Sequence, residues 1–390
     1  MGISIGLVGL GSFGSAFAEL FKNHPLVSRI ALCDRETERV RRFADDPAFA
    51  DKFNARDVYS SLDEISRSDV DAIALFTQPW LHAPQAVQAM EAGKHVYSAV
   101  PIISLPDGDE ILNWCDRLVE TCRRTGMSYM LGETTFYHAD TMFCRRKAAE
   151  GAFGSFVYAE GEYCHDYISP ECSLKKVRQH RLASAAGQEW LALEKAYHER
   201  GVQGGPMHYP THSTSGPISV MGAHALKVSA FGYRHQLGDD FFANEPFSNE
   251  TALFQMSNGA SMRISEHREI GRRDVETFRV FGTQASYSNE RWMDKEGDYP
   301  LHDDEMREPL PLEVREAFGF SEGAGGAYGG HGGSHPYLVH EFVSAVSGSR
   351  LPAINVWEAV RYMAAGVVAH QSALRDGELL PVPDWGDTPA

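Results

Sequence analysis

The sequence predicts two domains of different class. The first is an α/β domain with a doubly wound parallel sheet, and the second is an α+β domain on an open, mainly antiparallel sheet. The 390 residues fit two domains at roughly 100 to 200 residues each. Strand-like and helical segments alternate at first, whereas β-rich segments with short connections follow later. We therefore expect one domain at 1–130 and another at 131–390.

The first domain begins with ISIGLV at 3–8, an apolar, β-branched run typical of a buried parallel strand. A helical pattern at 15–22 follows it, and a second strand is predicted at 30–33. The remaining predicted elements alternate in the same way: strand 70–76, helix 83–92, strand 95–98, helix 109–124 and strand 128–131. Such alternation predicts helices on both faces of one sheet.

The second domain contains predicted strands at 155–162, 250–256, 261–266 and 277–281. Ser257-Asn258-Gly259 is a hairpin signal. We expect an exposed loop at 294–307, because that stretch is acidic and polar, and a flexible glycine-rich segment at 323–333. Predicted helices at 337–346 and 356–375 should pack back on the rest of the chain.

Charge and composition exclude several classes of protein. The chain has 36 basic and 53 acidic residues, a net charge of −17, which disfavours nucleic acid and anionic membranes as partners. No apolar run suggests a membrane span, and no export signal precedes the first strand. The few cysteines predict reduced, buried or inert thiols in the cytoplasm: Cys33, Cys115, Cys122, Cys144, Cys164 and Cys172.

A dinucleotide-binding pattern, Gly9-x-Gly11-x-x-Gly14, lies between the first strand and the first helix. The glycines permit a tight turn and close approach of a pyrophosphate, which the free amides of Ser12 and Phe13 at the helix start would bind. Asp34 ends the next strand and should accept the ribose hydroxyls. The pattern predicts a Rossmann domain that binds NAD. The adjacent Arg35 could instead hold the 2′-phosphate of NADP, and a glycine turn without a ligand is the alternative.

A second cofactor-binding segment is predicted where strand 70–76 ends. Thr77, Gln78, Trp80 and His82 follow that strand, and ligands of open α/β sheets bind at the carboxyl ends of strands. The alternative is an ordinary loop in which Thr77 caps a helix.

Together with Gly93-Lys-His-Val, these segments resemble the Gfo/Idh/MocA oxidoreductase family over nearly the whole chain. Members of that family usually read Glu-Lys-Pro where this chain reads Ala99-Val100-Pro101. The resemblance implies that the Lys is a general acid/base beside the hydride-transfer centre. Val100 cannot do that work, which argues against the ordinary dehydrogenase mechanism of the family.

The run Tyr209-Pro-Thr-His212 resembles one branch of that family, the NAD-dependent glycosidases such as the α-N-acetylgalactosaminidases. Members of the branch often lack the Lys too, and 162–166 and 331–335 are also similar to it. The resemblance implies a redox-neutral cycle: oxidation at C3 of the sugar, loss of the C2 proton and the aglycone, addition of water, and return of the hydride. Tyr209 and His212 would transfer protons, in roles that stay open; as an alternative, both are satisfied core groups.

Several further side chains are candidates for substrate binding. Glu133, Tyr137 and His165 could hold sugar hydroxyls, although Glu133 could equally cap a helix or lie on the surface. Lys175–Arg181 is a basic run in an acidic chain, and its Arg178 and Arg181, with Lys195, could hold an anionic substituent. That would fit a sulfoquinovoside or a glucuronide, whereas the alternative is a solvated helix face or a contact between subunits.

Other kinds of site are disfavoured. His208 and His212 have metal-ligand spacing, as do His331 and His335, but Pro210 and the glycines oppose helical geometry, so we predict no metal. By analogy we expect a homodimer or homotetramer formed through the second sheet. Two other functions stay open: an NAD-dependent sugar or polyol dehydrogenase without the usual Lys, and an inactive protein that binds sugar and NAD.

Overall fold

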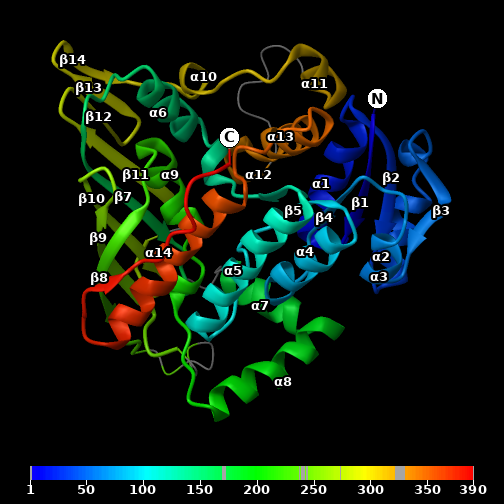
Figure 1. The fold of residues 1–390 in the computed structure, drawn as a ribbon, viewed down its shortest axis with the longest axis horizontal. Coiled ribbons are helices and arrows are strands. Elements are labelled where there is room, and N and C mark those ends of the chain that lie inside the picture. Colours follow the sequence, from blue (N-terminus) through cyan, green and yellow to red (C-terminus); the bar gives the residue numbers. More distant parts are fainter. Residues whose placement is uncertain are drawn as a thin grey trace.

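The structure is a computed structural model that describes residues 2–168, 173–236, 238, 242, 245–272, 274–320 and 330–389. It contains a six-stranded sheet and a nine-stranded sheet, which lie on opposite sides of a layer of helices (Figure 1). Of the sequence-based expectations, Cys172 and residues 323–329 of the glycine-rich segment lie outside the described residues. Among the described helices, none is long and apolar enough to cross a membrane.

The first sheet is entirely parallel and has the strand order β3-β2-β1-β4-β5-β6, which confirms the doubly wound fold. Its strands are β1 (Ile3–Val8), β2 (Val27–Cys33), β3 (Phe53–Tyr59), β4 (Ala72–Leu75), β5 (His95–Ser98) and β6 (Tyr129–Leu131). Its helices are α1 (Ser12–Asn23), α2 (Thr37–Ala44), α3 (Leu62–Ser66), α4 (His82–Glu91) and α5 (Gly108–Thr125), with 3-10 turns η1 (Pro47–Phe49) and η2 (Pro79–Leu81).

Burial explains which of these strands the sequence reveals. All six residues of β1 are buried, as a strand covered by helices on both faces should be. By contrast, β3 is a half-exposed edge strand of mixed polarity, FNARDVY, and its pattern does not stand out in the sequence. Helix α5 has a residue signal at each end: the side chain of Asp107 caps its first amides, and Gly126 ends it with φ +71°.

The second sheet has the order β14-β13-β12-β11-β7-β10-β9-β8-β15. All neighbours are antiparallel except β7 and β10, which confirms the predicted class. Its strands are β7 (Phe156–Cys164), β8 (Ala225–Tyr233), β9 (Asn249–Met256), β10 (Ser261–His267), β11 (Val275–Gly282), β12 (Ala285–Ser288), β13 (Arg291–Asp294), β14 (Gly297–Pro300) and β15 (Leu380–Pro381).

The expected loop at 294–307 is wrong. This segment contains β14, which pairs with β13, and then the short helix α10 (Asp303–Met306). Backbone hydrogen bonds of an edge hairpin need no apolar side chains, so an acidic sequence still pairs there. The other helices of this half are η3 (Thr135–Tyr137), α6 (Ala139–Ala149), α7 (Ser173–Leu182), α8 (Ala185–Glu199), η4 (Pro206–His208), α9 (Thr211–Met221), α11 (Leu312–Ala317), α12 (Gly330–Gly333), α13 (His335–Ser347) and α14 (Val356–Leu374).

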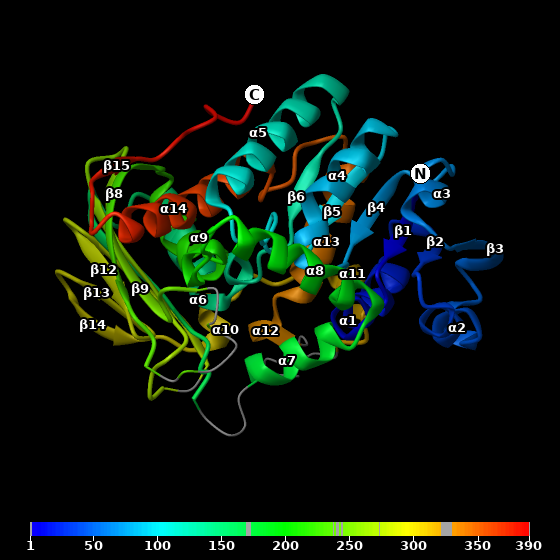
Figure 2. The same ribbon diagram turned by 90° about the horizontal axis from the view of Figure 1, so that it is seen from below.

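The C-terminal helices join the two halves. Helix α14 lies between α5 and the second sheet, and α13 packs on α1 and β1 (Figure 1). Helices α7 and α8 reach from the second domain toward the Rossmann domain (Figure 2). The five described cysteines are free and buried, in agreement with the prediction of reduced, inert thiols.

Candidate active site

The glycine loop after β1 has the shape that a dinucleotide requires. Gly9 has φ +90°, and a Cβ there would lie 2.8 Å from the carbonyl oxygen of Phe76. A Cβ on Gly14 would lie 2.0 Å from the carbonyl oxygen of Gly9, so only glycine lets α1 approach this closely. Above Gly11 the space is open, with Arg39 Nη1 3.9 Å away. Since α1 begins at Ser12 without a side-chain cap, its first amides remain available for a pyrophosphate.

Asp34 lies beside this loop, at the end of β2. Its Oδ2 accepts a hydrogen bond from the amide of Leu10 at 2.7 Å, and its Oδ1 accepts one from the amide of Glu36 at 2.8 Å. These two bonds fix the carboxylate at the rim of the loop, where it can meet a ribose. The neighbouring Arg35 points to the other domain and forms an ion pair with Glu189 of α8.

The segment after β4 carries the four side chains predicted to bind the cofactor, and they lie in different surroundings. Thr77 donates its hydroxyl hydrogen bond to Gln85, and Gln78 precedes η2. Trp80 stacks on Trp190 of α8, with ring centroids 4.7 Å apart. His82 is buried, and its ring nitrogens lie 2.8 Å and 3.1 Å from the carbonyl oxygens of Pro101 and Thr77. His82 therefore ties two loops together and has no ring nitrogen left for a cofactor.

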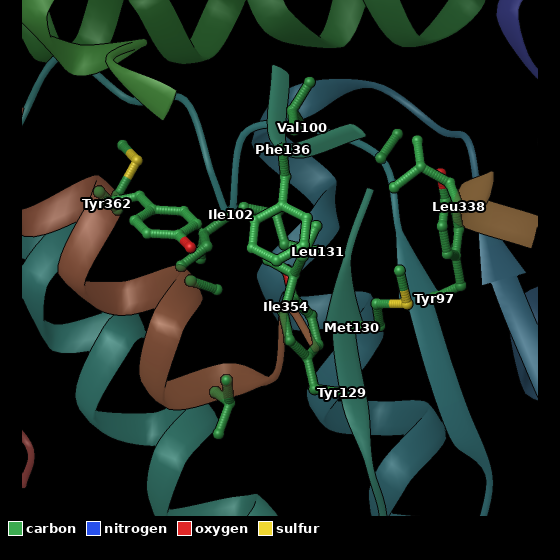
Figure 3. Close-up of a cluster of buried hydrophobic side chains, with 14 of the residues drawn as sticks. Tyr97, Val100, Ile102, Tyr129, Met130, Leu131, Phe136, Leu338, Ile354 and Tyr362 are labelled. Atoms are coloured by element: carbon green, nitrogen blue, oxygen red, sulfur yellow. The ribbon is translucent and has the colours of Figure 1, made fainter. Parts of the chain in front are cut away.

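Val100, where the resemblance leads us to expect a Lys in other members, is part of an apolar cluster. It is buried and lies with Ile102, Leu131 and Phe136 between the Rossmann sheet and α14 (Figure 3). The hydroxyl of Tyr209 donates a hydrogen bond of 3.4 Å to the carbonyl oxygen of Val100. The hydroxyl of Tyr209, which lies between η4 and α9, thus reaches the backbone at Val100.

Tyr209 and His212 lie side by side, with ring centroids 5.6 Å apart. His212 Nδ1 is 2.8 Å from Oε1 of Glu133, which also accepts a hydrogen bond from the amide of Thr135 at 3.0 Å. His212 is 7% exposed and Glu133 is fully buried. Glu133 is therefore not a surface carboxylate; it accepts the first amide of η3 and also orients His212.

Neighbouring charges make His212 and Glu133 an ion pair. Burial lowers the pKa of His212, but the charges of Glu133 and Glu276 and the hydrogen bond to Glu133 outweigh it and raise the pKa to about 9. Burial likewise raises the pKa of Glu133, yet the charge and hydrogen bond of His212 reverse that effect and bring the pKa to about 2. At neutral pH, His212 is therefore an imidazolium that can donate a proton.

Tyr209, unlike His212, is uncharged at neutral pH. Burial raises the pKa of Tyr209 above its ordinary value, and the positive charge of Arg181 partly opposes that rise. Tyr209 is a neutral phenol in this environment, and the guanidinium of Arg181 is the nearby charge that favours its phenolate form.

The loops around this pair add groups that sequence reasoning missed. The ring of Tyr163 lies 5.1 Å from that of His212, and its hydroxyl lies 2.8 Å from Nδ1 of His165. Tyr163 and His165 are two residues apart at the end of β7, so alternation along the strand could have placed both on one face. Glu276 of β11 and Glu266 of β10 also act on His212, and no sequence motif signals either of them.

The remaining predicted substrate residues are dispersed. Arg181 acts electrostatically on Tyr209 and Tyr163, and it is close enough to affect the pKa of His165 as well. Tyr137 is buried instead against Tyr337 of α13. Lys195 is 76% exposed on α8 and pairs with Glu199, so the structure does not bring it to the other site residues.

Arg178 is partly buried on α7, and its charge acts on Glu245. Burial raises the pKa of Glu245 to about 7 in spite of opposing positive charges nearby. Arg178 is thus associated with a carboxylate of the protein itself.

Comparison with known proteins shows what this chain resembles. Residues 3–133 match the model of the oxidoreductase family with an NAD-binding Rossmann fold, Gfo/Idh/MocA. A glycosyl hydrolase family 109 protein of Stenotrophomonas maltophilia is 24% identical, over 98% of this chain and 89% of that protein. An alpha-N-acetylgalactosaminidase of Tannerella forsythia is 21% identical, over 82% of this chain and 72% of that protein.

Solved structures show the same fold. A levoglucosan dehydrogenase, in complex with NADH and levoglucosan, superposes with a TM-score of 0.72 at 17% identity, over 98% of this chain and 100% of that chain. The family match and the two relatives support one conclusion. Residues 3–133 form an NAD-binding Rossmann domain of the Gfo/Idh/MocA type, and the chain is an NAD-dependent enzyme.

Proposed function

We propose that this enzyme is an NAD-dependent, redox-neutral glycoside hydrolase. The observation that supports it best is the pair of Tyr209 and the His212–Glu133 ion pair beside Val100, where an ordinary family dehydrogenase has its Lys. The two relatives named as glycoside hydrolases support the same reaction class.

The bound cofactor supplies a hydride acceptor for C3 of the sugar and returns the hydride at the end of the cycle. Gly9–Gly14 and Asp34 would hold it. As the hydride leaves, the C3 hydroxyl loses its proton to solvent, and O3 takes a proton back from solvent when the hydride returns. The resulting ketone makes the C2 proton acidic, so the side chains have two further protons to move. His212, charged at neutral pH, donates one to the glycosidic oxygen as the C1–O bond breaks. Tyr209 is a neutral phenol at rest, so it first gives its proton to solvent, a loss that the charge of Arg181 favours; the phenolate then removes the C2 proton as the C1–C2 double bond forms.

The second half of the cycle reverses these transfers. Neutral His212 takes a proton from the water that adds to C1, and Tyr209 returns its proton to C2. Each group thus regains its starting protonation state, and the net reaction is hydrolysis.

The substrate class we propose is a small sugar, with an anionic substituent at the Arg181 side. Arg181 is partly buried, and burial lowers its pKa. In the described part of the chain, no hydrogen bond or ion pair engages its guanidinium. A desolvated guanidinium without a carboxylate partner is suited to a carboxylate or sulfonate of a ligand.

The competing function is an NAD-dependent sugar dehydrogenase, which the similarity in fold to levoglucosan dehydrogenase favours. A panel of chromogenic glycosides, neutral and acidic, separates the two. A hydrolase releases the chromophore without a lasting rise in absorbance at 340 nm. A dehydrogenase accumulates NADH and leaves the glycosidic bond intact, and an inactive binding protein does neither.

We further propose that the enzyme is a cytoplasmic homodimer or homotetramer that associates through its second sheet. Large apolar side chains are exposed on one face of two neighbouring strands of that sheet, Phe231 on β8 and Leu253 on β9. Sedimentation equilibrium tests this, and a monomer at micromolar concentration would contradict it.

A further inference from the structure

We propose that Glu189, on α8 of the second domain, sets the preference of the enzyme for NAD over NADP by neutralising Arg35. NADP differs from NAD by a phosphate on the 2′-hydroxyl of the adenosine ribose, so the preference depends on the charges around that hydroxyl. The proposal holds for a hydrolase and for a dehydrogenase, because both use the same cofactor site.

The Rossmann domain by itself carries cations suited to NADP. Asp34 follows β2 directly, and Arg35 and Arg39 flank it, with Arg39 Nη1 3.7 Å from the Asp34 carboxylate. An arginine at this place is the group that accommodates a 2′-phosphate in dinucleotide-binding folds. The charges of this domain alone therefore do not decide between the two cofactors.

Carboxylates engage both of these arginines. Arg39 pairs with Glu36 at 2.9 Å, within its own helix. Arg35 pairs with Glu189 through two parallel contacts, Nη2 to Oε1 at 2.6 Å and Nη1 to Oε2 at 3.0 Å. This bidentate geometry is the one that a phosphate would need, so the carboxylate of Glu189 occupies the binding fork of Arg35.

Glu189 also decides the local charge balance. With it, the carboxylates of Asp34, Glu36 and Glu189 face only two guanidinium groups, and the surroundings repel a phosphate dianion. Without it, two carboxylates would face two guanidinium groups, and Arg35 would be free to bind the phosphate.

The position of α8 does not depend on the ion pair. Trp190, next to Glu189, stacks on Trp80 at 4.7 Å with an interplanar angle of 24°. At the far end of the helix, the hydroxyl of Tyr197 donates to Glu110 at 2.6 Å. The Arg35–Glu189 pair itself is more than half exposed and contributes little to stability. Replacing Glu189 therefore changes the charge and leaves the helix in place.

The test is a competition for the cofactor site. The protein and its Glu189→Gln variant are dialysed to equilibrium against equal concentrations of NAD and NADP, and the bound nucleotides are then quantified. We expect the bound ratio of NADP to NAD to rise at least ~10-fold in Glu189→Gln, which is ~1.4 kcal/mol. Glu194→Gln, on the same helix and with the same loss of charge, should leave the ratio unchanged.

Two further variants identify Arg35 as the group that Glu189 controls. Adding Arg35→Gln to Glu189→Gln should return the ratio toward that of the unaltered protein. Arg35→Gln alone should lower the ratio further, because the carboxylate of Glu189 then faces the phosphate unpaired. Near-ultraviolet circular dichroism of the stacked tryptophans reports whether α8 stays docked. An unchanged ratio in Glu189→Gln, or equal loss of both nucleotides, would overturn the proposal.

Discussion

The Nδ1 atom of His212 lies 2.8 Å from Oε1 of Glu133, in a part of the molecule where Glu133 is fully buried. The two residues are 79 positions apart, and the fold joins the loop after β6 to the start of α9 to bring them together. A carboxylate thereby keeps a buried imidazole charged at neutral pH. That single contact determines which group of the site can act as a proton donor.

The pH dependence of turnover should report this contact. Because Glu133 raises the pKa of His212 to about 9, a rate that needs the imidazolium should fall as pH rises through about 9. In Glu133→Gln the charge is gone, so the alkaline limb should move down by at least ~1 pH unit. The measurement is kcat against pH for both proteins. Superimposable profiles would show that His212 is not the donor.

Stability should depend on pH through the same pair. The folded pKa of His212 is raised, so its contribution is full below about pH 6.5 and is lost as pH rises through about 9. The pKa of Glu133 is lowered, so its contribution is full above about 4.5 and is lost as pH falls toward about 2. Urea unfolding should give greater stability at pH 6 than at pH 10. This difference should shrink in Glu133→Gln, and an undiminished difference would contradict the ion pair.

Turnover should depend on both proton-transfer groups. Tyr209→Phe and His212→Ala should each reduce kcat at least ~100-fold, since each removes one proton transfer. NAD binding, measured by calorimetry, should be retained because neither residue belongs to the glycine loop. Near-normal kcat in both variants would place the chemistry elsewhere. Lys195→Ala is a useful control, because that side chain is exposed and pairs with Glu199, and it should stay fully active.

Arg181 should discriminate between substrates. Arg181→Gln should raise KM at least ~10-fold for a sugar with a carboxylate or sulfonate, because a charge-assisted contact is lost. The same variant should change the KM of a neutral glycoside far less. Parallel assays on matched acidic and neutral aryl glycosides provide the comparison. Equal effects on both KM values would show that Arg181 acts only on Tyr209 and does not bind the anionic group of the substrate.

Asp34 should control affinity for the cofactor. Asp34→Ala removes the ribose acceptor and also the two bonds that hold the amides of Leu10 and Glu36, so NAD should bind at least ~10-fold more weakly. Titration calorimetry with NAD measures this directly. Unchanged affinity would argue against the ribose contact.

Local patterns predict much of this fold. The buried strand β1, its three glycines and Asp34 follow strong periodicity and turn rules, and the structure has them where the sequence indicates. The polar edge strand β3 and the hairpin of β13 and β14 were not predicted. Backbone pairing forms them rather than apolar burial, so they leave no apolar pattern in the sequence.

The site was only partly predictable, for a different reason. Tyr209 and His212 come from one short motif, and the structure places their rings next to each other. The role of Glu133 depends on a contact across 79 positions, and that of Glu189 on one across 154. Charge pairs of such separation leave no periodic signal in a single sequence, so only the folded chain reveals them.

The redox-neutral cycle is the central claim, and proton NMR in D2O tests it most directly. The enzyme with NAD is incubated with a cleaved glycoside while absorbance at 340 nm is followed. The account predicts release of the aglycone, deuterium at C2 of the released sugar and no build-up of NADH. Release without deuterium at C2, or NADH accumulation with the glycosidic bond intact, would contradict it.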